Sequence, residues 1–107
     1  MHEIELFLSI ANFPNLKVLR LSKVNLSNQA LRNLFTNENL KNLKKLNLKG
    51  GYLAKVLTAD LCDCRVTFKD IKNVLLGDTC LNAESIKTFT EIFSSASLDN
   101  LNLANNS

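Results

Sequence analysis

The residues with the clearest chemical potential are three cysteines, Cys62, Cys64 and Cys80, and a single histidine, His2. Cysteine and histidine together could ligate zinc, but structural zinc sites usually use two ligand pairs, each spaced two to four residues apart. Here one C-x-C pair stands alone, and the histidine lies far away at the N-terminus. An odd number of cysteines also fits a disulfide framework poorly. We therefore predict semi-buried free thiols in a reducing compartment, with no bound metal and no cofactor.

The other motifs that could carry chemistry are incomplete. Nucleophilic catalysis of the serine or cysteine type needs a histidine beside the nucleophile, and the one histidine of the sequence is His2 at the N-terminus. Gly50-Gly51 lacks the lysine and the spacing of a phosphate-binding loop. Asp60, Asp63 and Asp70 lack the alternating spacing of a calcium loop, and we expect the first two to be solvated helix residues. The sequence therefore predicts a protein that is not an enzyme.

Charge and hydropathy exclude further classes. Lysine and arginine number 13 against 10 acidic residues, and the net charge of +3 is too mild to indicate nucleic-acid binding by itself. No apolar run approaches the roughly 18 residues that a bilayer requires. No basic stretch precedes Leu6–Ile10, as a signal peptide would need. We predict a cytoplasmic protein that does not bind membranes.

Four copies of an L-x-x-L-x-L pattern supply the elements that position any binding residues. They start at residues 16, 43, 71 and 98, which are 27, 28 and 27 residues apart. The alternating apolar residues of each copy are typical of a short strand. Ser27 is a good N-cap for a helix with apolar residues at 31, 34 and 35, and Asn82 for one carrying Ile86, Phe89 and Ile92. The sequence thus predicts strands alternating with helices.

This pattern resembles the leucine-rich repeat, L-x-x-L-x-L-x-x-N-x-L, over essentially the whole chain. The period of 27–28 residues is most similar to the ribonuclease-inhibitor-like subclass, which includes cytosolic ribonuclease inhibitor, the sensor ends of NOD-like receptors and the GTPase-activating proteins of Ran. The resemblance implies an α/β leucine-rich-repeat solenoid, a right-handed β-α superhelix with parallel strands on its concave face and helices on its convex face. It implies one domain over residues 1–107: the helical tail of a repeat at 1–15, repeats starting at 16, 43 and 71, and a truncated one at 98.

Two departures from the repeat stand out. The slot for its asparagine holds Val24, Gly51, Thr79 and Asn106, so we expect the bonds of that asparagine to be missing, or made by water or by Asn25 one place later. Most of the 15 asparagines fall instead on loops and exposed strand positions. The second copy lacks a capping residue, and its return segment over 54–70 is expected to be either short irregular helix or extended chain.

The repeat frame predicts a binding surface. Because the leucines at the first, fourth and sixth positions face inward, the residues between and after them project onto the strand face. Seven of the 13 basic residues gather there, mostly on the first two repeats. The predicted partner-binding residues are Lys17, Arg20, Lys23, Lys44, Lys45, Lys49, Tyr52 and Lys72. The competing interpretation is that exposed lysines only keep the repeats soluble and their strands unreactive.

We interpret the chain as a non-enzymatic protein–protein interaction module whose partner carries acidic groups. Nucleic acid is disfavoured, because Tyr52 is the one aromatic residue among the basic ones. The alternative is a regulatory scaffold or sensor fragment of a longer protein, of GTPase-activating, ubiquitin-ligase or NOD-like-receptor type, for which Arg65 is the one basic candidate on an irregular connection. Neither end carries the polar cap that repeat arrays need, so we expect a piece of a longer array or end-to-end self-association. The sequence does not identify the partner, the pathway or the oligomeric state.

Overall fold

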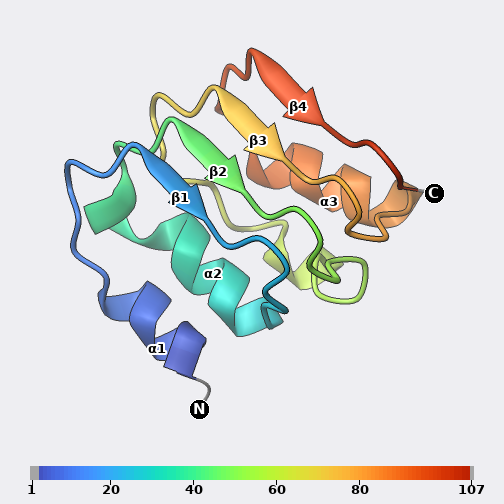
Figure 1. Cartoon of the computed structure of the whole chain (residues 1–107), viewed down its shortest axis with the longest axis horizontal. Helices are drawn as coiled ribbons and strands as arrows, with labels where there is room; N and C mark the ends of the chain where they lie inside the picture. The colour runs from blue at the N-terminus through green and yellow to red at the C-terminus, as the bar shows by residue number, and fades with distance from the viewer. Residues whose placement is uncertain (1–2, 107) are drawn as a thin grey trace.

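The computed structural model describes residues 3–106, so His2 lies outside the described part. Within it the chain forms a small α/β domain with a four-stranded, all-parallel sheet and three α-helices (Figure 1). The helices are α1 (Glu3–Ile10), α2 (Asn28–Thr36) and α3 (Ala83–Ile92), and they lie on one side of the sheet (Figure 1). The strands are β1 (Val18–Arg20), β2 (Lys45–Asn47), β3 (Asn73–Leu75) and β4 (Asn100–Asn102). The α/β class predicted from the sequence is confirmed.

The strands pair in the order β1-β2-β3-β4, in the register set by the repeat period. One row across the sheet consists of Val18, Lys45, Asn73 and Asn100, and the next consists of Leu19, Leu46, Val74 and Leu101. The alignment of the four sequence copies is therefore confirmed at the level of strand pairing. The inward anchors of the two central strands are all buried: Leu43, Leu46, Leu48, Ile71, Val74 and Leu76.

The helices that follow β1 and β3 and lead to the next strand, which we call return helices, are α2 and the longer α3. Both begin at their predicted caps, Ser27 and Asn82. The Ser27 hydroxyl accepts a bond of 3.0 Å from the Ala30 N–H, and it also donates to the Glu5 carboxylate of α1. The Asn82 side chain accepts from the Ser85 N–H at 2.9 Å, and the Ser85 hydroxyl accepts from the Asn82 N–H at 2.9 Å. This reciprocal pair satisfies two N–H groups that a helix start would otherwise leave without partners.

The connection between β2 and β3 departs from this plan, as its sequence predicts. Its one regular element is the 3-10 turn η2 (Ala59–Leu61), so the short irregular helix is observed in place of an extended segment. Leu53, Leu57 and Leu61 still bury their side chains at helix-like spacing. Thr58 stands at the N-cap of η2, but its side chain makes no capping bond to the backbone.

Asparagine side chains on loops and at exposed positions also join neighbouring units. Asn25 accepts from the Tyr52 N–H at 3.2 Å, so the expected shift by one place is confirmed. Asn42 donates to the Pro14 carbonyl at 2.6 Å. Asn106 accepts from the N–H groups of Thr79 and Leu81 in the preceding unit at 3.2 and 2.9 Å. Each bond spans about one repeat and fixes adjacent units to one another.

A left-handed residue follows every strand at the same repeat position, two residues after the last anchor. The four residues and their φ angles are Lys23 (61°), Gly50 (84°), Asp78 (57°) and Asn105 (60°). Only one of them is the glycine that this conformation favours. The same backbone turn therefore recurs in all four units although the residue types differ.

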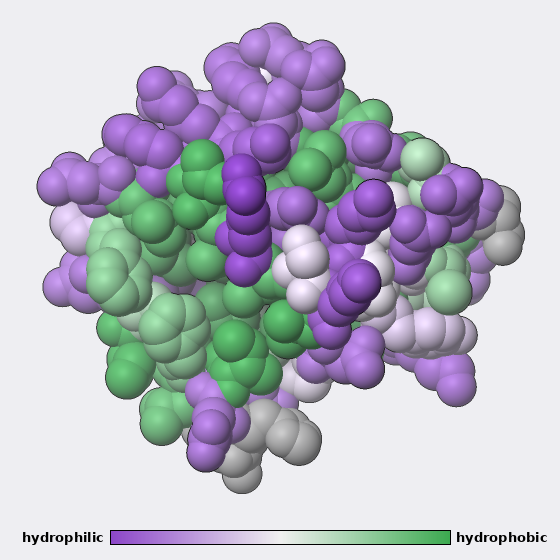
Figure 2. Space-filling model, viewed as in Figure 1, coloured by the Kyte–Doolittle hydropathy of each residue, from purple (hydrophilic) through white to green (hydrophobic). Residues whose placement is uncertain are grey.

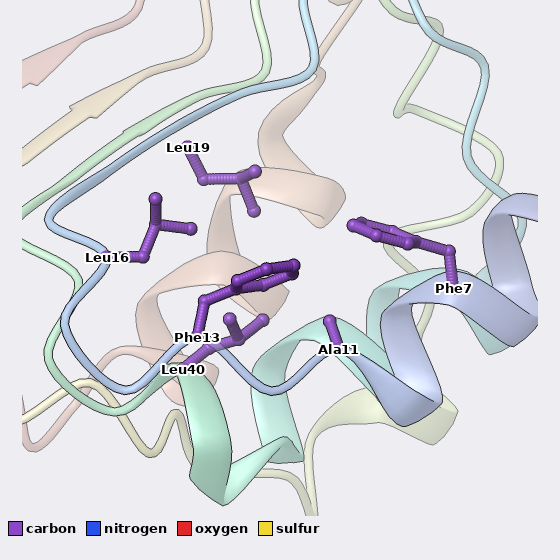
Figure 3. Close-up of a pocket in the computed structure, with 6 residues that line it drawn as sticks. All are labelled: Phe7, Ala11, Phe13, Leu16, Leu19 and Leu40. Atoms are coloured by element: carbon purple, nitrogen blue, oxygen red, sulfur yellow. The ribbon is translucent and has the colours of Figure 1, made fainter.

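Apolar side chains are exposed at both ends of the sheet. At the β1 end, Phe7 and Phe13 are 42% and 49% exposed, and their rings lean toward one another beside Leu16 and Leu19 (Figure 3). Figure 2 shows this end as a broad hydrophobic surface over α1 and β1. At the β4 end, Leu101 is 42% exposed, and Leu98 and Leu103 are partly buried.

Candidate interaction surface

Lysines form a row at the end of the sheet where the strands begin, one residue before β1, β2 and β3. The Lys17 carbonyl accepts from the N–H groups of Lys44 and Lys45, at 2.7 and 3.0 Å. The Lys44 carbonyl accepts from the Lys72 N–H at 2.9 Å, and the Lys72 carbonyl accepts from the Asp99 N–H at 2.8 Å. These backbone bonds hold Lys17, Lys44, Lys72 and Asp99 as direct neighbours. The structure thus brings three predicted basic residues into one row, which ends on an acid.

A second basic group lies where the first two strands end. The Lys23 N–H donates to the Lys49 carbonyl at 2.7 Å, which places these two residues side by side. Arg20 closes β1 and is exposed, and Tyr52 is 45% exposed. The Lys55 ammonium lies 6.0 Å from the centroid of the Tyr52 ring, so it extends this group. Sequence reasoning missed Lys55 because it falls after the repeat pattern has ended.

The basic side chains of the strand face have no acidic partners in the part of the chain that the structure describes. Within residues 3–106 the one ion pair joins Arg32 to Asp63, away from this face. The Lys72 ammonium group donates to the Ser97 carbonyl at 3.3 Å, which is a neutral partner. Lysines on adjacent parallel strands, about 4.8 Å apart, repel one another by up to about 1 kcal/mol per pair in water. The surface is therefore positively charged and available to an anionic group.

The face changes character toward β4, where asparagines replace lysines. The Asn100 amide donates to the Asn73 side-chain oxygen at 2.8 Å. Lys45, Asn73, Asn100 and Asn102 line a shallow polar groove there. Asn102 also accepts from the Ala104 N–H at 2.9 Å, as Asn47 does from the Lys49 N–H, so these two side chains hold the turns after their strands.

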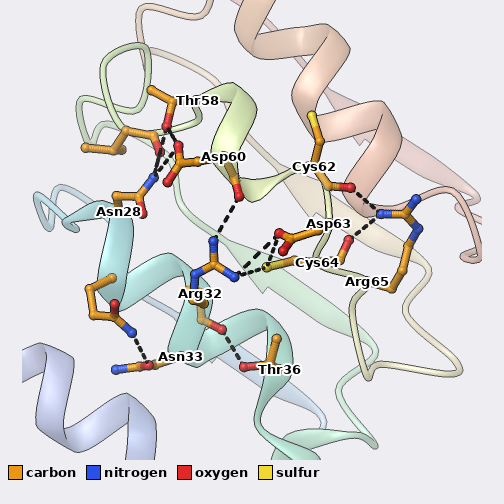
Figure 4. Close-up of polar contacts among 12 residues, drawn as sticks. Asn28, Arg32, Asn33, Thr36, Thr58, Asp60, Cys62, Asp63, Cys64 and Arg65 are labelled. Atoms are coloured by element: carbon orange, nitrogen blue, oxygen red, sulfur yellow. Dashed lines mark hydrogen bonds and ion pairs between the residues drawn. The ribbon is translucent and has the colours of Figure 1, made fainter.

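A polar cluster on the helix side ties the irregular segment to α2 (Figure 4). The Arg32 guanidinium donates to the Asp60 carbonyl at 2.9 Å and to the Cys64 sulfur at 3.2 Å, and it lies 3.5 Å from the Asp63 carboxylate. The Asn28 amide donates to the Thr58 hydroxyl at 3.0 Å. Asp60 and Asp63 are both exposed, as expected of solvated residues, although Asp60 lies in the 3-10 turn η2 and Asp63 follows that turn.

Electrostatics in this cluster do not favour reactivity. The hydrogen bond from Thr58 is the main cause that holds the pKa of Asp60 below its ordinary value. Burial raises the pKa of the Cys64 thiol, although the nearby Arg32 charge opposes that shift. A protonated, buried thiol is a poor nucleophile. Cys62 is half-buried, whereas Cys80 is exposed, which corrects the expectation that all three cysteines would be semi-buried.

Three further observations bear on alternative chemistry. Within the described residues, no group of three or more Cys, His, Asp or Glu side chains lies close enough to hold a metal ion. No helix among these residues is long and apolar enough to cross a membrane. The Arg65 guanidinium donates to the carbonyls of Cys62 and Cys64 at 2.5 and 2.6 Å, so it folds back on its own segment.

Comparisons with family models, curated proteins and solved structures found no match to this chain.

Proposed function

We propose that the chain forms a leucine-rich-repeat solenoid that binds a protein partner through its uncovered strand face, without catalysis. The observation that carries the proposal is the positive charge of that face, which has no acidic partner within residues 3–106. Lys17, Lys44 and Lys45 are adjacent at one end of the strands, and Lys23 and Lys49 are adjacent at the other. A partner with carboxylates about one strand spacing apart would relieve the repulsion within these groups.

The residue types support protein as the class of partner. Arg20 and Tyr52 are exposed on this face, and arginine and tyrosine are favoured at the centres of protein interfaces. Nucleic-acid surfaces usually interleave basic residues with several aromatic ones, and Tyr52 is the one aromatic side chain that we assign to this face. The GTPase-activating form of the regulatory alternative would need an arginine that projects into a partner's site. Arg65 instead donates to backbone carbonyls, so we do not propose that form.

The test measures binding of a fluorescent poly-glutamate peptide by anisotropy at several salt concentrations. Lys45→Glu combined with Lys49→Glu should weaken binding at least tenfold and flatten its dependence on salt, because two contacts change from attraction to repulsion. Lys49→Glu alone should weaken binding less than the double variant does. Lys87→Glu is the matched control for this single change and should leave binding unchanged, since Lys87 is an exposed lysine on α3.

Two outcomes would contradict the proposal. Equal binding by the double variant and the parent chain would remove the strand face as the site. Tighter binding to a single-stranded oligonucleotide of the same charge than to poly-glutamate would point to nucleic acid as the partner.

A further inference from the structure

We propose that the chain associates with copies of itself head to tail, with β4 of one copy pairing in parallel with β1 of the next. The occupant of each exposed end is thus a second copy of the same chain. Its register follows from the pairing already present inside the molecule, where three successive joints use the same bonds. This inference concerns the edges of the sheet, so it stands or falls independently of the function proposed for the strand face.

The backbone groups at the two edges are complementary. At each internal joint, the N–H of the third repeat position donates to the carbonyl of the second position on the preceding strand: Lys45 to Lys17, Asn73 to Lys44, and Asn100 to Lys72, at 2.9 to 3.1 Å. The Val18 N–H holds this position on β1, where no strand precedes it among the described residues. The Asp99 carbonyl holds the matching position beside β4. A second copy in register would join these two groups.

A second copy would also complete the backbone bonds in which an N–H group donates to the carbonyl of the following strand. Inside the molecule the sixth-position N–H groups of Leu21, Leu48 and Leu76 donate to the fifth-position carbonyl of the following strand, at 2.8 to 2.9 Å. Leu103 holds the sixth position at the β4 edge, and Arg20 of the next copy would supply the carbonyl. The intermolecular joint would therefore repeat the pattern of the three internal ones.

The charges at the two edges are also complementary. The row of lysines that starts at Lys17 and continues through Lys44 and Lys72 ends at Asp99, each residue bonded to the last through its backbone. With a second copy in register, Asp99 lies directly beside Lys17 of that copy. Every internal step before Asp99 sets two like charges side by side, so the joint between copies would be more favourable than those steps.

The spacing between helix and strand is the same at the two edges, and the apolar surfaces there would meet in the joint. α3 ends at residue 92, eight residues before β4 begins, and α1 ends at residue 10, eight residues before β1 begins. α1 thus has the position of a return helix, although no strand precedes it among the described residues. A β4 strand docked beside β1 would fill that place. It would set the exposed Leu101 against Leu19 and the apolar hollow formed with Phe7 and Phe13.

The arrangement predicts open-ended growth, because a head-to-tail contact that does not close a ring leaves a free edge at each end. In sedimentation equilibrium of the 107-residue chain, the weight-average mass should rise continuously with concentration, past that of a dimer. A monomer at every concentration up to the solubility limit would overturn the proposal. A plateau at the mass of a dimer would also overturn it, since it indicates a contact that uses the same surface of both copies.

Charge reversal tests the register of the joint. Asp99→Lys and Lys17→Asp should each weaken association about fivefold to twentyfold, because one exposed neighbouring pair changes from attraction to repulsion. The double variant restores an opposite pair between copies, so it should regain most of the affinity lost by either single variant. Glu38→Lys, an exposed acid on the helix side, is the matched control and should leave association unchanged. Failure of the double variant to recover would refute this register.

Val18→Pro tests the edge by itself. Proline removes the N–H that the second copy needs, and the internal pattern gives this N–H no acceptor within one copy, so an edge strand should tolerate the change. We expect the parent's unfolding midpoint at low concentration and a loss of association at high concentration. Association by a folded Val18→Pro variant with the parent's affinity would exclude β1 as the docking edge.

Discussion

Asn37 holds α1 to the rest of the molecule, and its removal gives a sharp test of how this end is stabilised. The side chain is 9% exposed. Its amide donates to the carbonyls of Leu8 and Ala11, both at 2.9 Å, and its oxygen accepts from the Asn39 N–H at 2.8 Å. α1 has only eight residues, which is too short to be stable in water without such contacts.

The Asn37→Ala variant should lose about 3 kcal/mol of unfolding free energy, since each of three hydrogen bonds contributes about 1 kcal/mol net. That is a large part of the roughly 5–15 kcal/mol typical of a domain. For a chain of this size it corresponds to a midpoint about 12 °C lower. Urea denaturation followed by circular dichroism measures the loss, and hydrogen exchange should show the α1 amides losing protection first.

Two further variants separate hydrogen bonding from the filling of space. Asn39→Ala makes the same chemical change at an exposed side chain and should shift stability by less than about 0.5 kcal/mol. Asn37→Asp keeps the volume but replaces both donated bonds with a carboxylate that faces two carbonyls, so it should destabilise at least as much as alanine. An Asn37→Asp variant as stable as the parent would refute this account of the residue.

Two other predictions follow from close packing and burial. A Cβ at Gly51 would lie 2.5 Å from the Val24 carbonyl oxygen of the neighbouring unit. Gly51→Ala should therefore lower the free energy of unfolding by about 1–3 kcal/mol, as measured by urea titration. An unchanged free energy of unfolding would show that the units can move apart. Iodoacetamide should modify the exposed Cys80 first and the buried Cys64 last, because the raised pKa of Cys64 keeps its thiol protonated at neutral pH. Mass spectrometry of timed samples distinguishes this order from equal rates, which would contradict the burial of Cys64.

The positions of the strands could be predicted because their anchors are local and periodic. Leu46 and Val74 are inward-facing anchors that the pattern identifies, and the pairing of rows then follows from counting along the chain. The helix starts at Ser27 and Asn82 could be predicted equally well, since each cap oxygen lies three residues before the N–H group that donates to it. The predicted binding residues Lys17 and Lys44 are neighbours in the structure for the same reason.

The contacts that sequence reasoning missed are long-range and depend on the path of the backbone. Arg32 contacts Cys64 across 32 residues, and Asn37 bonds to Leu8 across 29. Neither residue lies on an anchor, and exposed helical positions commonly carry both types. The sequence did not predict the bond from the Ala104 N–H to the Asn102 side chain, because this bond depends on the turn that follows the strand.

In the left-handed turn after β1, the residue that favours a stable fold differs from the residue that favours partner binding. Glycine adopts this conformation without strain, whereas a residue with a Cβ commonly loses about 1–2 kcal/mol there. Gly50 occupies the turn after β2, but Lys23 occupies the equivalent turn after β1, at φ 61°. Glycine at position 23 would relax the backbone and remove one positive charge from the proposed binding surface. Selection for a more stable fold would therefore favour glycine at position 23, whereas selection for partner binding would favour lysine.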